Sequence, residues 1–128
     1  MRHYEELATY ERDGFTVIVD KTWEDIDPWD QLSECFDSKE ELYEDINNCK
    51  YDWFMLRVRA MLDGNEMGSA YLGGCLYEDA RDVLTDGTAE DMIFEALQEA
   101  RRYALDLKAR LVDMCLEEQL ENSEYFGA

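Results

Sequence analysis

Carboxylates are the most numerous side chains of this chain that could perform chemistry. Asp and Glu supply 32 of the 128 residues, against 12 Lys and Arg, so the formal net charge is −20. A pair of carboxylates can act as general acid and base, but among so many acids some pairs lie close together by chance. His3 is the single histidine, which removes most routes to Ser–His–Asp or Cys–His catalysis. The composition therefore predicts a protein that is not an enzyme.

Metal and cofactor sites are not expected either. The sequence contains neither a P-loop nor a GxGxxG pattern, and one histidine cannot build a zinc site that needs several. If Gly87 is the sixth residue of an EF-hand loop, Ile93 takes the twelfth position, where calcium requires a carboxylate. Without a CxxC motif, four widely spaced cysteines predict reduced, mostly buried thiols: Cys35, Cys49, Cys75 and Cys115.

The acids are concentrated in two blocks. Residues 24–45 hold ten acids and one base, and residues 78–95 hold seven acids and one base, whereas residues 96–112 are net positive. A single charged run is usually a solvated face, but two such blocks at −20 favour a surface for a strongly basic partner. The candidate partner-binding residues are Glu24, Asp25, Asp27, Asp30, Glu34, Asp37, Glu40, Glu41, Glu44, Asp45, Glu78, Asp79, Asp82, Asp86, Glu90 and Asp91.

The sequence patterns of the elements that position these acids predict one α+β domain over residues 1–128. Residues 15–20 and 51–62 have strand patterns, a returning strand is expected over 67–75, and the pattern over 2–11 does not decide between helix and strand. Asp63–Gly64 predicts a hairpin turn, and Gly73–Gly74 should end or bulge the returning strand. We expect a small antiparallel sheet packed on a long C-terminal helix, with short acidic helices beside it.

Helix signals complete this prediction. Asp27 is the expected N-cap of one short helix, Ser38 opens a second through a capping box that ends near Asn47–Asn48, and 78–84 forms a third. The long helix should start at Thr88 as N-cap and run to about Leu120. Three- and four-residue spacing predicts that its core face packs on Phe54, Leu56 and Val58 through Ile93, Leu97, Ala104, Leu107 and Leu111.

In size and charge, over the whole chain, the protein resembles the small acidic DNA-mimic proteins of phages and mobile elements, which inhibit restriction enzymes or CRISPR complexes. The resemblance implies an inhibitor that blocks the basic DNA groove of such a complex, and it carries over no individual residue. Two alternatives stay open: an immunity or antitoxin protein that neutralises a basic nuclease, and an acidic adaptor subunit of a larger assembly. The segment Tyr71–Glu78 looks like a family signature, but we attach it to no family.

Partners and location follow from the same charge. We expect a basic nucleic-acid-binding protein as partner and no direct contact with nucleic acid or membrane, since both are anionic. The N-terminus has no signal-peptide pattern and no stretch approaches the roughly 18 apolar residues of a membrane span, so we expect a cytoplasmic protein. Trp53, Met55 and Met61 are expected to be covered by another element or to form an apolar patch. A homodimer is expected through residues 96–112 or the face of Arg57 and Arg59.

Overall fold

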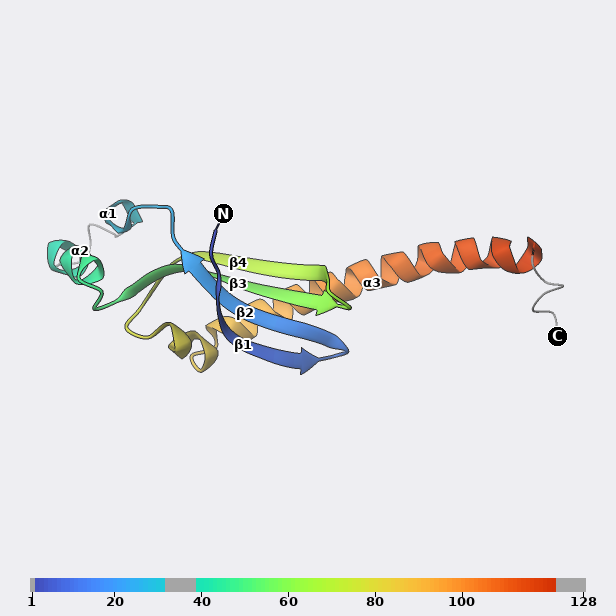
Figure 1. Ribbon diagram of the computed structural model, residues 1–128, viewed down its shortest axis with the longest axis horizontal. Coiled ribbons are helices and arrows are strands. Elements are labelled where there is room, and N and C mark those ends of the chain that lie inside the picture. Colours follow the sequence, from blue (N-terminus) through green and yellow to red (C-terminus); the bar gives the residue numbers. More distant parts are fainter. Residues whose placement is uncertain (1, 32–38, 122–128) are drawn as a thin grey trace.

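The structure is a computed structural model that describes residues 2–31 and 39–121. It contains a four-stranded antiparallel sheet in the order β1-β2-β3-β4, with a long helix, α3, against one face (Figure 1). This is the predicted α+β class. The elements are β1 (Glu5–Arg12), β2 (Phe15–Trp23), α1 (Pro28–Gln31), α2 (Lys39–Asn47), β3 (Asp52–Leu62), β4 (Asn65–Tyr77), the 3₁₀ helix η1 (Ala80–Leu84) and α3 (Thr88–Glu121).

Two Asp-Gly turns fold the strands into hairpins. Asp63 and Gly64 have φ values of 49° and 81°, and Asp13 and Gly14 have φ values of 55° and 85°. Positive φ at both central residues is the type I′ pattern, whose twist matches that of the flanking strands. The Asp63–Gly64 turn confirms the predicted hairpin. The Asp13–Gly14 turn joins β1 to β2, so residues 5–12, within the undecided segment 2–11 and one residue beyond it, form a strand. The Asp13–Gly14 pair was a signal for this hairpin.

Strand β4 bulges at its glycine pair and continues to Tyr77. Phe54 pairs with Cys75 and Leu56 pairs with Leu72, so Gly73 and Gly74 together lie opposite one residue of β3. Gly74 has a φ of 65°, a conformation that glycine adopts without steric cost. The predicted bulge is confirmed, and the alternative that the strand ends there is wrong.

The core lies between the sheet and the first turns of α3. Leu56 and Val58 on β3 are fully buried. On α3, Ile93 is 1% exposed and Leu97 is 5% exposed. These residues alternate along the strand and recur at helical spacing on α3, so each element contributes one apolar face. This confirms the predicted packing of Ile93 and Leu97 on Phe54, Leu56 and Val58.

The prediction that this core face continues along α3 is wrong beyond Ala104. Ala104 still packs on the core, but Leu107 is 39% exposed and Leu111 is 47% exposed. The reason is the length of the sheet: β3 turns at Asp63–Gly64, while α3 runs on past that turn to Glu121 (Figure 1). The helix ends close to the predicted Leu120, but its second half has no sheet beneath it.

The helix starts are close to those predicted. Asp27 Oδ1 accepts the backbone N–H of Trp29 at 2.9 Å, which confirms it as the N-cap of α1. Thr88, however, is the first residue of α3 rather than its N-cap. Gly87 contributes the carbonyl that accepts the first helical N–H, from Asp91 at 3.0 Å, and Asp86 supplies the capping carboxylate. Residues 80–84 form a 3₁₀ helix, and Ser38 lies outside the described residues.

The cysteine prediction holds for one of the two thiols whose surroundings are described. Cys75 is buried and burial raises its pKa to about 11, which keeps the thiol protonated. Cys49 is exposed, contrary to the expectation of mostly buried thiols. It lies, with a φ of 63°, in the turn that follows α2, outside the packed elements. Cys35 and the side chain of Cys115 lie outside the described part.

Gly68 on β4 marks the closest approach of the sheet to α3. A Cβ atom at this position would lie 2.2 Å from the carbonyl oxygen of Ala96 and 2.7 Å from the backbone nitrogen of Ala100. Since both contacts are backbone atoms of a packed helix, Gly68→Ala must displace the helix from the sheet. We expect a loss of about 1–3 kcal/mol in the free energy of unfolding, as for other overpacked sites.

Urea unfolding followed by circular dichroism measures this loss. Ser69→Ala is the matched control, because Ser69 is the next residue and lies on the opposite face of the strand. Its effect should stay within about 0.5 kcal/mol. A Gly68→Ala variant as stable as the parent would show that α3 does not approach β4 this closely.

Candidate partner-binding surface

Helices α1 and α2 form a small lobe at one end of the sheet, which we call the acidic lobe (residues 28–31 and 39–47; Figure 1). The rings of Trp29 and Tyr43 meet edge to face with centroids 5.4 Å apart. Lys39 places its ammonium group 4.1 Å from the centroid of the Trp29 ring. These aromatic contacts hold α1 against α2, so the acids on both helices have a defined place.

Four carboxylates of the acidic lobe point into solvent. Their side chains are exposed and make no hydrogen bond or ion pair with other residues in the described ranges: Asp30, Glu40, Glu41 and Glu44. Because no internal base neutralises them within these ranges, their charge is available to a partner. The structure therefore keeps these four as candidate contact residues.

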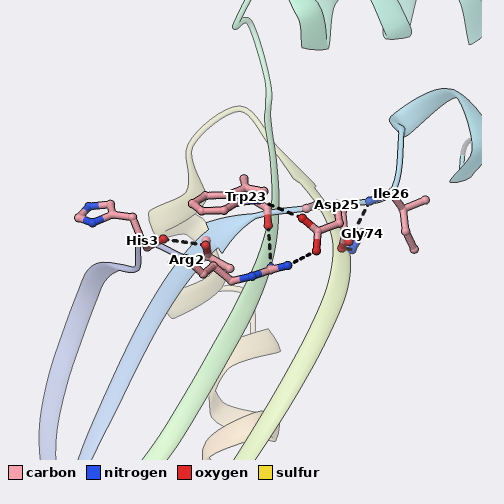
Figure 2. A network of polar contacts seen from close by, with 8 residues as sticks. Arg2, His3, Trp23, Asp25, Ile26 and Gly74 are labelled. Carbon is pink, nitrogen blue, oxygen red and sulfur yellow. Dashed lines mark hydrogen bonds and ion pairs between the residues drawn. The ribbon is translucent and has the colours of Figure 1, made fainter.

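Other acids of the 24–45 block are used to hold the fold together. Glu24 accepts the backbone N–H of Gly74 at 2.6 Å, which fastens the β4 bulge to the end of β2. Asp25 accepts hydrogen bonds from the indole N–H of Trp23, at 2.9 Å, and from the guanidinium of Arg2 (Figure 2). Asp45 lies 3.5 Å from the ammonium of Lys50. These three carboxylates therefore stabilise the fold. Glu34 and Asp37 lie outside the described residues.

Asp86 plays a similar structural role in the second block. It accepts the Tyr77 hydroxyl at 2.5 Å and the backbone N–H of Thr88 at 2.9 Å. The hydrogen bond from Tyr77 is the main cause that holds the pKa of Asp86 below its usual value. Burial, and then the same hydrogen bond, raises the pKa of Tyr77. Asp86 thus joins the end of β4 to the start of α3.

Asp79 and Glu90 also have hydrogen-bond partners within the fold. Asp79 accepts the backbone N–H of Arg81 at 2.9 Å and caps η1. Glu90 accepts both guanidinium nitrogens of Arg12 at 2.7 and 2.8 Å, and this hydrogen bonding lowers the pKa of Glu90. The pair ties α3 to the edge strand β1. Three of the candidate carboxylates in this block stay exposed and unpaired within the described part: Glu78, Asp82 and Asp91.

The structure therefore divides the predicted surface into two classes. The acids that accept hydrogen bonds or form ion pairs within the fold are Glu24, Asp25, Asp27, Asp45, Asp79, Asp86 and Glu90. The solvent-facing acids are Asp30, Glu40, Glu41, Glu44, Glu78, Asp82 and Asp91. Both solvent-facing groups lie in the half of the molecule away from the free end of α3 (Figure 1).

A charged cluster on the sheet face away from α3 was missed by sequence reasoning. Asp20, which is 3% exposed, accepts Arg57 Nε at 2.8 Å, Arg57 Nη2 at 2.6 Å and Arg59 Nη2 at 3.3 Å. The Arg57 guanidinium carbon lies 3.4 Å from the centroid of the Tyr4 ring. Hydrogen bonding to Asp20 raises the pKa of Arg57. An acid directly after the apolar run Phe15–Val19 was the available signal.

This cluster explains what the two arginines do. Asp20 and Arg57 are direct partners in the register of β2 and β3, so the two arginines neutralise a buried acid of the neighbouring strand. Trp53, Met55 and Met61 on the same face are half-buried, and the indole N–H of Trp53 donates to the backbone carbonyl of Ile26 at 2.9 Å. The face is therefore a mixed surface with a paired ionic centre, and α3 covers the other side of the sheet.

Metal ligands, membrane spans and similar proteins were each sought. In residues 2–31 and 39–121, no three His, Cys, Asp or Glu side chains come together as a metal site. No helix in this part of the chain is long and apolar enough to cross a membrane. No protein-family model, curated protein or solved structure matches the chain.

Proposed function

We propose that this protein is an acidic inhibitor that occupies the basic DNA-binding groove of a restriction, CRISPR or other DNA-processing complex. Its exposed carboxylates take the places that DNA phosphates would occupy. The observation that supports the proposal is the set of solvent-facing carboxylates on the acidic lobe, Asp30, Glu40, Glu41 and Glu44, in a chain of net charge −20.

Charge density sets the scale of the imitation. B-DNA carries one negative charge per roughly 1.7 Å of helix axis, so twenty charges correspond to about 34 Å of duplex. Because several carboxylates form caps and ion pairs within the fold, fewer carboxylates are free to contact a partner. The contact surface of the inhibitor is thus shorter than the total charge implies, and it is centred on the acidic lobe.

Inhibition by this route needs no chemical step. A basic groove attracts the acidic lobe over long range, which speeds the encounter, and the folded domain then excludes duplex DNA by occupying its place. The mechanism is stoichiometric, because one inhibitor blocks one groove. It is also weakened by salt, since exposed charges are screened over about 8 Å at physiological ionic strength.

A competition experiment tests the proposal. A restriction endonuclease and an RNA-guided nuclease are each loaded with a fluorescent duplex that contains their own site, and duplex anisotropy is followed as the protein is added. We expect stoichiometric displacement from the target complex. We also expect slower association, by about tenfold, for a variant with Asp30→Asn, Glu40→Gln, Glu41→Gln and Glu44→Gln, because electrostatic steering changes association rates by 10–10³.

A control variant removes the same number of charges at the opposite end of the sheet: Glu11→Gln, Asp63→Asn, Glu66→Gln and Glu99→Gln. It should displace DNA like the parent. Equal loss in both variants would mean that only total charge matters, which contradicts a contact surface on the acidic lobe. A ternary complex in which DNA and the protein bind together contradicts mimicry itself and favours the adaptor alternative.

A further inference from the structure

The second half of α3 extends beyond the sheet with an apolar stripe that nothing in the described structure covers. From Arg101 to Glu121 the helix is about 30 Å long at about 1.5 Å per residue. Leu107, Leu111 and Met114 are 39%, 47% and 62% exposed. An unpartnered stripe of this kind on a helix in water marks an interaction surface.

The stripe continues the face that packs on the sheet. Its members follow Ala100 at spacings of four, three, four and three residues: Ala104, Leu107, Leu111 and Met114. This is the seven-residue repeat by which two helices pack along a common seam. The face that packs on the sheet thus continues beyond it in a spacing suited to packing against another helix.

A groove beside the stripe enlarges the apolar surface. It has a volume of about 300 Å³ and is lined by Leu62 and Met67 from the β3–β4 hairpin, together with Leu107 and Leu111 from α3. Large side chains from a partner helix can enter it where the sheet ends. The stripe and the groove together form one continuous surface.

We propose that the occupant of this surface is a second copy of the chain, bound through the α3 stripe with the two helices antiparallel. The proposal does not depend on the function proposed above, because it rests on the apolar surface and the charges of α3 alone. It selects the 96–112 region, rather than the face of Arg57 and Arg59, as the contact between copies.

The charges along the free half of α3 set the direction of pairing. Residues 101–110 carry four bases and one acid, whereas residues 113–121 carry four acids and no base. An antiparallel pair places each basic segment beside the acidic segment of its partner, and a parallel pair would place acid beside acid. The antiparallel pair also sends the two acidic sheet domains to opposite ends, which reduces their mutual repulsion.

Sedimentation equilibrium measures the association directly. At about 150 mM salt, where charge is screened over about 8 Å, we expect twice the monomer mass of 15.1 kDa. Leu107→Glu with Leu111→Glu should weaken dimerisation by at least about tenfold, since a buried unpaired charge costs more than 1.4 kcal/mol.

The matched control is Leu105→Glu with Ala109→Glu. It adds the same two charges to the opposite side of the same helix, and it should stay dimeric. A parent protein that sediments as a monomer overturns the proposal, and so does a control that dissociates as readily as the stripe variant. Circular dichroism verifies that each variant keeps its helix content.

A charge exchange tests the direction of pairing. Glu117→Lys with Glu118→Lys should weaken an antiparallel dimer, because the altered end then meets the basic segment of its partner. Adding Lys108→Glu and Arg110→Glu to that variant should restore the dimer. In a parallel dimer the first exchange would not weaken association, and that result would overturn the antiparallel arrangement.

Discussion

Replacing Asp20 with alanine should lower the free energy of unfolding by about 3–5 kcal/mol, the usual loss when one partner of a buried ion pair is removed. Asp20 is 3% exposed and is the common acceptor for Arg57 and Arg59. Without it, two guanidinium groups remain on the sheet with no acid between them. The Nε of Arg59 already lacks a hydrogen-bond partner in the described structure, so little local compensation is available.

Chemical denaturation of a set of variants checks this result. Asp20→Asn keeps the shape and one acceptor oxygen but loses the charge, so it should fall between the parent and Asp20→Ala. A triple variant with Asp20→Val, Arg57→Met and Arg59→Met removes the whole ionic group. It should regain most of the lost stability, because well-packed apolar side chains often replace buried ion pairs without net loss. If Asp20→Ala costs less than about 1 kcal/mol, the cluster is not a stabilising ion pair.

Replacing Ile93 with alanine should cost about 2–5 kcal/mol, as for other large core side chains cut to alanine. Ile93 is 1% exposed and lies with Leu56 and Val58 in the core between α3 and the sheet. The substitution removes apolar surface and leaves a cavity in a part of the molecule that cannot collapse, since strands and helix are both held by hydrogen bonds. Thermal unfolding followed by circular dichroism should show a clear fall in midpoint temperature.

Leu105→Ala is the matched control on the same helix. Leu105 is 67% exposed and lies on the side of α3 away from both the sheet and the stripe, so its removal should change stability by less than about 0.5 kcal/mol. Similar losses at Ile93 and Leu105 would mean that the first half of α3 is not the packed half. That outcome would contradict the fold described above.

Local patterns in the sequence were enough to predict the fold class. Alternation of apolar residues placed strand β3 within one residue of its observed start, because a strand must present every second side chain to the core. Asp63–Gly64 predicted its turn because few other residues adopt positive φ. Asp27–Pro28 predicted the start of α1 for an equally local reason. The homodimer, the partner and the absence of enzymatic activity remain predictions.

Only the tertiary structure decided which apolar and acidic residues are free. Ile93 and Leu111 lie on the same face of α3, but Ile93 is buried and Leu111 is exposed. The difference arises because the sheet, which is built from other segments, ends before it reaches Leu111. Likewise, the sequence shows that Glu90 and Glu44 are both acids in helices, but Arg12, 78 residues away, pairs with Glu90 alone. Periodicity and charge are properties of neighbouring residues, whereas burial and ion pairing depend on residues that the fold brings together from distant positions.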